Sequence, residues 1–220
     1  MKPTPLLLLG GGGHCAAVVD VIEATQAFEI VGIIESTLAP PEALSGDVLG
    51  VPVVGTDRDL KSQIGTTPSC LVTVGQMTTS ATRAQLFQQV QRFGGDLPTL
   101  VSPLAHVAAS ASLGAGTVVM HQALVNARAK VGVNCIINSK ALVEHDAHIG
   151  DHTHISTGAI VNGGARIGRD CMIGSGAVIK QGVQIADHVI IGAGARIVKN
   201  ITRPGCYVDL GRELNQVIGL

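Results

Sequence analysis

The chain has 220 residues, enough for one or two domains, and 46% of them are hydrophobic, enough for a sizeable core. Its formal net charge of −1 argues against a nucleic-acid partner, which needs a basic surface. The longest early apolar run, residues 6–9, is too short for a signal peptide or a membrane span, and the five cysteines show no close pairing, so we expect a cytoplasmic protein with reduced thiols and no membrane partner.

The first hundred residues alternate between short apolar runs and helical patterns, which predicts an α/β domain around a parallel sheet. Strands are expected over residues 6–9, 30–34, 52–55 and 70–74. Helices are expected over residues 15–24 and 79–93, with a shorter one for which Asp57 is the plausible N-cap. This domain is predicted to span residues 1–100.

A glycine-rich loop over residues 10–13 follows the first strand and opens the first helix. Bare N–H groups at a helix N-terminus form an anion site, and Glu35 ends the second strand, where such folds contact a ribose hydroxyl. Cys15 replaces the third glycine of the dinucleotide fingerprint, so one nucleotide or the diphosphate of a nucleotide sugar fits better than NAD. His14 is either exposed there by chance or contacts phosphate, and its position favours the contact.

From residue 107 to residue 197, every sixth residue is Val, Leu or Ile without exception. This period is neither helical nor that of a simple strand, and it indicates a β-helix of hexapeptide repeats. Each hexad supplies a short strand and a bend, three hexads close a triangular coil of about eighteen residues, and the coils stack at roughly 4.8 Å. A small residue four places after each aliphatic is expected near the corner, and the Gly or Asn that often follows the aliphatic is expected to adopt unusual backbone angles.

Four of the eight histidines lie close together in this repeat: His145, His148, His152 and His154. None takes the inward aliphatic position, so His145 and His154 are expected to project outward, and His148 and His152 to face solvent. Glu144 and Asp146 flank His145, and a corner there would let a carboxylate orient the ring.

Two chemistries fit this histidine cluster. Histidine accepts protons near neutral pH, as an amine or hydroxyl that attacks a thioester requires. The alternative is zinc held by three histidines shared between subunits, as in the gamma-class carbonic anhydrases. Zinc would leave the glycine-loop domain unexplained.

The motifs VEHDAHIGDHTHISTG (residues 143–158) and LGGGGH (residues 9–14) resemble those of sugar O- and N-acetyltransferases. That family joins a small nucleotide-binding domain to a left-handed β-helix, and the resemblance covers almost the whole chain. It implies a Rossmann-like α/β domain over residues 1–100, a left-handed parallel β-helix with a C-terminal tail over residues 101–220, and a homotrimer with active sites between subunits. It also implies acetyl-CoA as co-substrate, with no metal.

The resemblance assigns five residues to acetyl transfer. His145 is the base, and Asp146 orients it. His154 lies by the acetyl group, the amide of Gly163 holds the thioester oxygen, and Asn138 lines the cleft.

Two further groups of residues are implied to bind the substrates. The nucleotide sugar is held by Gly12, Gly13 and His14 at the diphosphate and by Glu35 at the ribose or base. The coenzyme arm is contacted by amides around Gly176, Gly192 and Ala193.

The expected reaction is acetylation of the 4-amino group of a nucleotide-linked 4-amino-4,6-dideoxysugar, for O-antigen or other surface glycan synthesis. The sequence departs from the family at Ser36, where a second acid is common, and at Gln76 and Met77, where many members have Asn. Both positions are expected near the base, so GDP, as in GDP-perosamine, joins UDP and dTDP as a candidate. The alternatives are O-acetylation of sialic acid and a non-catalytic nucleotide-sugar-binding protein.

Overall fold

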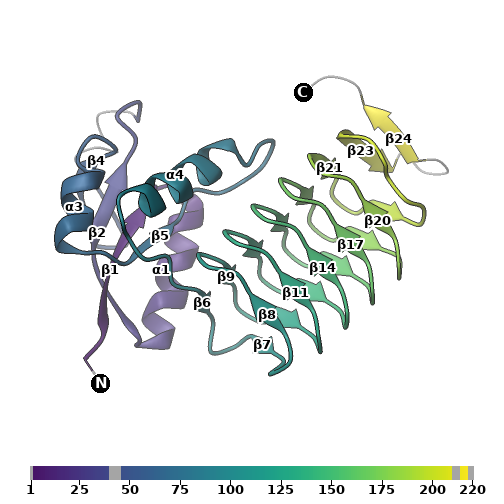
Figure 1. The fold of residues 1–220 in the computed structure, drawn as a ribbon, viewed down its shortest axis with the longest axis horizontal. Coiled ribbons are helices and arrows are strands. Elements are labelled where there is room, and N and C mark those ends of the chain that lie inside the picture. The colour runs from purple at the N-terminus through teal and green to yellow at the C-terminus, as the bar shows by residue number, and fades with distance from the viewer. Residues whose placement is uncertain (1, 40–45, 210–213, 218–220) are drawn as a thin grey trace. The chain divides into compact units, whose positions relative to one another are not determined.

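The computed structural model describes residues 2–39, 46–209 and 214–217, without the side chains of 209 and 214–217. The chain divides into two compact units, Met1–Gly75 with Ala81–Leu100, and Gln76–Ser80 with Val101–Leu220 (Figure 1). The short segment Gln76–Ser80, expected within the first domain, thus belongs to the second unit. Among the described residues, no helix is long and apolar enough to cross a membrane.

The first unit is an α/β fold around a five-stranded sheet of order β3-β4-β2-β1-β5. Its strands are β1 (Thr4–Leu9), β2 (Phe28–Glu35), β3 (Asp47–Val48), β4 (Val51–Thr56) and β5 (Cys70–Val72). Its helices are α1 (Gly13–Thr25), α3 (Leu60–Thr66) and α4 (Ala81–Arg92). The apolar run of β1 is fully buried from Leu6 to Leu9, as expected for a central strand with neighbours on both sides.

The sheet is parallel, as expected, with one antiparallel strand added at its edge. Strands β4, β2, β1 and β5 pair in parallel, but β3 pairs antiparallel with β4. Leu49 and Gly50 join these two strands with φ angles of 52° and 80°, and positive φ at both central residues is typical of a tight hairpin turn. A strand of two residues is too short to show the alternation that predicts strands.

The predicted N-cap Asp57 was also wrong. Helix α3 begins at Leu60 with Asp59 at the N-cap position. The Asp59 carboxylate accepts hydrogen bonds from Thr56 N at 2.9 Å and from Thr56 Oγ1 at 3.1 Å, while Asp57 accepts one from Thr37 N at 3.2 Å. A local Asp–Thr turn therefore precedes the helix.

The second unit is a stack of short parallel strands that forms the β-helix, to which β24 adds one antiparallel strand beside β23 (Figure 1). One sheet contains β7 (His106–Val107), β10 (Leu124–Val125), β13 (Leu142–Val143), β16 (Ile160–Val161), β19 (Val178–Ile179) and β22 (Arg196–Ile197). The second contains β8 (Ser112–Leu113), β11 (Lys130–Val131), β14 (His148–Ile149), β17 (Arg166–Ile167) and β20 (Gln184–Ile185). The third contains β6 (Leu100–Val101), β9 (Val118–Val119), β12 (Ile136–Ile137), β15 (His154–Ile155), β18 (Met172–Ile173), β21 (Val189–Ile191), β23 (Gly205–Asp209) and β24 (Leu214–Val217).

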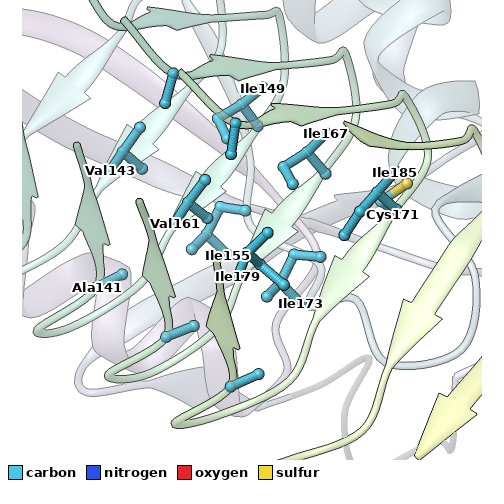
Figure 2. Packing of buried hydrophobic residues seen from close by; sticks show 14 of the residues in the cluster. Ala141, Val143, Ile149, Ile155, Val161, Ile167, Cys171, Ile173, Ile179 and Ile185 are labelled. Atoms are coloured by element: carbon cyan, nitrogen blue, oxygen red, sulfur yellow. The ribbon is translucent and has the colours of Figure 1, made fainter. Parts of the chain in front are cut away.

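The strand register confirms three hexads per coil. Val125 pairs with Val143, and Val143 pairs with Val161, so each aliphatic stacks on the equivalent residue of the next coil. These side chains point inward and pack against one another (Figure 2). The repeated aliphatics from Val119 to Ile197 are all at most 4% exposed, so they form one continuous core.

The glycines that follow the aliphatics do not serve the purpose expected of them. The positive φ angles fall instead three residues after the aliphatic, as at Asp146 (60°), Gly164 (65°) and Gly182 (71°). Gly150 has no positive φ, but a Cβ there would lie 2.5 Å from the backbone of Gly168. Glycine is needed after the aliphatic in this sheet because successive coils approach too closely for a side chain.

Candidate active site

His145 lies at a corner of the β-helix, between the end of β13 and the start of β14, and its side chain is 51% exposed. Its Nδ1 atom is 2.8 Å from Oδ2 of Asp146, which has a φ of 60°. Its amide donates a hydrogen bond of 2.9 Å to Oε2 of Glu144. The expected corner is present and brings Asp146 onto the ring.

This contact determines the tautomer of a neutral His145 ring. A carboxylate only accepts hydrogen bonds, so Nδ1 carries the proton and Nε2 presents a lone pair. The ring is thereby prepared to accept a proton at Nε2.

Asp146 is held in turn by Arg128. The Arg128 side chain donates from Nε to Oδ1 at 2.6 Å and from Nη2 to Oδ2 at 2.8 Å. The Arg128 guanidinium, and after it the hydrogen bond from His145, holds the pKa of the Asp146 carboxyl well below its usual range. Asp146 is therefore ionised throughout the neutral range.

Gly163 lies directly against the His145 ring. A Cβ added at residue 163 would come 2.7 Å from both Cε1 and Nε2 of His145. The neighbouring amide of Gly164 donates to the His145 carbonyl at 2.9 Å, which fixes the two turns against each other. The missing side chain at residue 163 leaves the space that the imidazole occupies.

The Gly163 amide differs from the equivalent amides of the two preceding coils. Those are capped by the side chain before them: Asn126 Oδ1 accepts from Ala127 N at 2.7 Å, and Glu144 Oε2 accepts from His145 N at 2.9 Å. Asn162 instead donates from Nδ2 to the Ile179 carbonyl at 2.7 Å. Gly163 is buried, yet its N–H has no acceptor among the described residues. Buried backbone donors are almost always paired, so this one is available to a ligand beside His145.

His154 was expected to project outward from the prism, and it is nevertheless buried, at 6% exposed, because the Gln76 segment covers it. Its Nδ1 lies 2.8 Å from the carbonyl oxygen of Gln76, and its Nε2 lies 3.1 Å from Nδ2 of Asn138. A carbonyl only accepts, so Nδ1 carries the proton and Nε2 accepts from Asn138. Gln76 also donates from Nε2 to the Cys171 carbonyl at 3.0 Å and so covers this part of the β-helix.

The three residues expected at the coenzyme arm differ in what they offer. The amide of Gly176 donates to the Thr157 carbonyl at 2.9 Å, and that of Gly192 donates to the Tyr207 carbonyl at 2.8 Å. Ala193 is exposed, and its amide has no acceptor within the described part of the chain. Of the three amides, only that of Ala193 can bind a ligand without losing an existing bond.

The other two histidines of the cluster have separate partners. Arg166 donates to Nδ1 of His148 at 3.1 Å, and burial, followed by the charges of Arg166 and Lys130, lowers the pKa of His148. His152 Nδ1 lies 2.9 Å from Nδ2 of Asn134. Across the residues that the structure describes, no three His, Cys, Asp or Glu side chains gather as metal ligands.

The glycine loop of the first unit lies at the N-terminus of α1, with Gly12 as the N-cap. Gly10 has a φ of 102°, and a Cβ there would collide with Val74. Gly12 and Gly13 are exposed, and a Cβ at either would meet nothing within 4 Å. His14 follows as the second residue of the helix, half-buried. Gly10 is thus required by the backbone, whereas Gly12 and Gly13 leave the helix N-terminus open to an anion.

Glu35 ends β2 and faces this loop. Its Oε2 accepts a hydrogen bond of 2.6 Å from Gly11 N, and its Oε1 accepts one of 2.7 Å from Ser36 N. A pocket of about 280 Å³ opens beside it, lined by Gly10, Ile34, Glu35, Ser36, Leu38, Asp57, Val74, Thr82, Gln85, Leu86 and Gln89. The lining combines apolar side chains with carboxylates and amides, as small-ligand pockets do.

Comparison with known proteins follows the same division of the chain. Residues 5–90 match the PglD N-terminal domain, and residues 164–199 match the bacterial transferase hexapeptide repeat. The acetyltransferase domain of PglB from Neisseria gonorrhoeae is 31% identical, with a TM-score of 0.86 over 97% of this chain and 99% of that one. The chain belongs to the hexapeptide-repeat sugar acetyltransferases.

Two other solved structures share the fold with this acetyltransferase. A variant of perosamine N-acetyltransferase from Caulobacter crescentus, in complex with CoA and GDP-perosamine, is 27% identical with a TM-score of 0.87 over 97% of each chain. WeeI from Acinetobacter baumannii is 21% identical with a TM-score of 0.82 over 97% of this chain and 100% of that one, which shows the fold alone. No curated protein sequence matches the chain.

Sequence reasoning missed several residues that shape the two candidate sites. Arg128 could have been found, because it lies one coil before Asp146 and carries the opposite charge. The sequence did not indicate that Gln85 and Gln89 of α4 line the pocket, because a polar helix face is usually only a solvated surface. Gln76 was noted as a departure from the family, but nothing in the sequence indicated that it covers His154.

Proposed function

We propose that this enzyme transfers the acetyl group of acetyl-CoA to the 4-amino group of a nucleotide-linked 4-amino-4,6-dideoxysugar. The acceptor is GDP-perosamine or a UDP-linked amino sugar. Residues 1–100 form the domain that binds the nucleotide sugar, and residues 101–220 form the acetyltransferase domain. The proposal is supported by membership of the family and by the arrangement around His145.

The observation that carries the proposal is the meeting of His145 and Gly163. The ring presents Nε2 as an acceptor, and Gly163, whose amide has no acceptor among the described residues, lies against that side of the ring, where its Cβ would be. Acyl transfer from a thioester to an amine needs both a proton acceptor and a donor to the developing oxyanion. These two groups supply them at one place.

The chemistry then follows from these groups. The neutral amine attacks the thioester carbonyl, the Gly163 N–H stabilises the oxyanion, and His145 Nε2 takes the proton from the amine. The C–N bond forms first, collapse of the resulting oxyanion then breaks the C–S bond, and the proton passes from His145 to the departing thiolate. In the alternative course, His145 mainly positions the amine and receives its proton only after the attack. Asp146 keeps the ring oriented throughout.

The nucleotide is bound by the first domain in this proposal. The open N-terminus of α1 at Gly12, Gly13 and His14 holds the diphosphate, because its amides and helix dipole favour anions. Glu35 contacts the ribose or the base, beside the pocket that it lines. Ser36 and Asp57 line the same pocket, and they are the polar groups against which guanine and uracil would be distinguished.

In the acetyltransferase domain, His154 and Asn138 line the cleft beside the acetyl group, and the Ala193 amide contacts the coenzyme arm next to Gly176 and Gly192. The enzyme is a cytoplasmic homotrimer that serves O-antigen or other surface glycan synthesis, with active sites between subunits. The exposure of His145 supports a shared site, because a second chain would close the half-open ring from water.

The test is acetyl-CoA consumption with a panel of UDP-, GDP- and dTDP-linked 4-amino-4,6-dideoxysugars, with free sialic acid alongside. We expect fast turnover of one nucleotide-linked amine, with an acetamido product identified by mass spectrometry and NMR. Turnover of sialic acid alone would overturn the acceptor and leave the first domain without its proposed purpose. Binding of coenzyme A without turnover of any sugar in the panel would contradict the proposed reaction with these acceptors.

A further inference from the structure

Arg128 is the residue one coil before Asp146, at the same corner of the β-helix. Both have left-handed backbone angles, with φ of 58° at Arg128 and 60° at Asp146, so their side chains leave equivalent points of successive coils. The guanidinium meets the carboxylate with two parallel contacts, of 2.6 Å and 2.8 Å. This bidentate geometry fixes the plane of the carboxylate, whereas a single contact would leave it free to rotate.

The carboxylate held in this way is the one that orients His145. Asp146 Oδ2 accepts from both Arg128 Nη2 and His145 Nδ1, each at 2.8 Å. The Asp146 side chain is 42% exposed, so without Arg128 it could rotate toward water and release the ring. The ring would then be free to adopt the other tautomer, with the proton on Nε2.

The same coil supports His145 from its other side. Asn126 Nδ2 donates to Glu144 Oε2 at 3.0 Å, and that oxygen accepts the His145 amide at 2.9 Å. One turn, containing Asn126 and Arg128, therefore holds both the backbone and the side chain of the next turn, which contains His145.

The chain contains a second Arg–Asp pair of the same spacing that does not contact His145. Arg169 and Asp187 are also one coil apart, and Arg169 Nε lies 3.3 Å from Asp187 Oδ2. The Arg169 side chain is 62% exposed, against 67% for Arg128. Loss of this second ion pair removes the same kind of surface charge without touching His145.

We propose that Arg128 is a positioning residue that acts through Asp146 to keep the Nε2 atom of His145 unprotonated and directed at the acceptor. The inference rests on the proposed role of His145 as proton acceptor. Because Arg128 touches neither the ring nor Gly163 in the described contacts, its effect belongs to turnover and not to substrate affinity.

The kinetic experiment compares Arg128→Met, Arg128→Lys and the control Arg169→Met in the full-length enzyme, with acetyl-CoA and the nucleotide-linked amine that turns over fastest. We expect Arg128→Met to lower kcat by about three- to tenfold, with each KM changed by less than about twofold. Arg128→Lys keeps the charge but not the bidentate contact, so its kcat should lie between those of Arg128→Met and the wild type. Arg169→Met should match the wild type. Equal values for the Arg128 and Arg169 variants would overturn the proposal.

A double-mutant cycle separates positioning from a direct contact with substrate. In the Asp146→Asn background, Arg128→Met should cause no further loss, because the path from Arg128 to the ring is already broken. A further loss equal to that in the wild-type background, or a rise in the KM of either substrate, would show that Arg128 acts elsewhere.

A second readout does not depend on activity. Long-range ¹H–¹⁵N spectra of histidine-labelled protein, with His145 identified by its loss in His145→Ala, report the tautomer of the ring. We expect the Nδ1–H form in the wild type and in Arg169→Met, and a mixture of both forms in Arg128→Met. An unchanged tautomer would refute the positioning role even if no acceptor turned over. An active His145→Ala variant would instead refute the role of His145 in the proposed function.

Discussion

Replacement of Gly163 by alanine should displace the His145 ring without removing any group that takes part in the chemistry. The added Cβ would lie 2.7 Å from Cε1 and Nε2, whereas ordinary contact begins at 3.4 Å, so the ring must retreat by about 0.7 Å. That retreat strains its 2.8 Å contact with Asp146. Misplacement of a catalytic group by about 1 Å costs on the order of 10²-fold, so we expect kcat to fall by roughly that factor.

The assay is steady-state release of free coenzyme A thiol, with melting temperature as the check on folding. The Gly163 φ is not positive and alanine keeps the N–H, so the fold and the oxyanion donor should survive. The control is Gly182→Asn at the corresponding turn of the next coil, where φ is 71°, the space is open and Asn tolerates the left-handed backbone. Wild-type kcat in a folded Gly163→Ala enzyme would refute the claim that His145 must lie against Gly163.

Three further predictions concern the thiols, the coil stacking and the pH dependence. Burial raises the pKa of Cys15, and it raises the pKa values of Cys70 and Cys171 to about 12. Iodoacetamide at pH 8 should therefore label only the half-buried Cys206 in the native protein. Labelling of Cys171 in the native protein, detected by mass spectrometry, would contradict this prediction. Gly150→Ala should lower the free energy of unfolding by about 1–3 kcal/mol in denaturant titrations, because its Cβ would lie 2.5 Å from the backbone of the next coil, and an unchanged midpoint would show that the coils yield. Folding lowers the pKa of His148 below its value in the unfolded chain, which is near 6.5. The stability linked to this shift is therefore fully present above the unfolded-state pKa and is lost as the pH falls through the folded-state pKa. His148→Asn should therefore lose less stability than the wild type between pH 7.5 and pH 5.5 in thermal melts, and equal losses would contradict the lowered pKa.

The β-helix could be predicted from the sequence because a single physical demand repeats along it. Each coil must place an aliphatic inside the prism, so Val125, Val143 and Val161 occur at a fixed spacing and pair as expected. The contact between His145 and Asp146 was foreseeable for the same reason, because the hexad frame locates the corners. The choice of glycine at residue 150 was misread, because contact between coils is not visible in the local sequence.

The rest of the site depends on segments that meet only in three dimensions. The cover over His154 comes from Gln76, 78 residues earlier in the chain, and no periodicity links them. The uncapped amide of Gly163 depends on which way the Asn162 side chain turns, whereas Asn126 at the equivalent position caps its own turn. Identical residues at equivalent positions thus make different hydrogen bonds, and a sequence pattern cannot distinguish them.

The most direct test of the account is the turnover of His145→Ala, measured beside Asp146→Asn and with coenzyme A affinity and melting temperature as controls. If His145 is the proton acceptor, kcat should fall by roughly 10²–10⁴-fold while the fold and the affinity for coenzyme A stay as in the wild type. A loss of less than about tenfold in a folded variant would contradict that role and leave His145 as a group that only positions the amine.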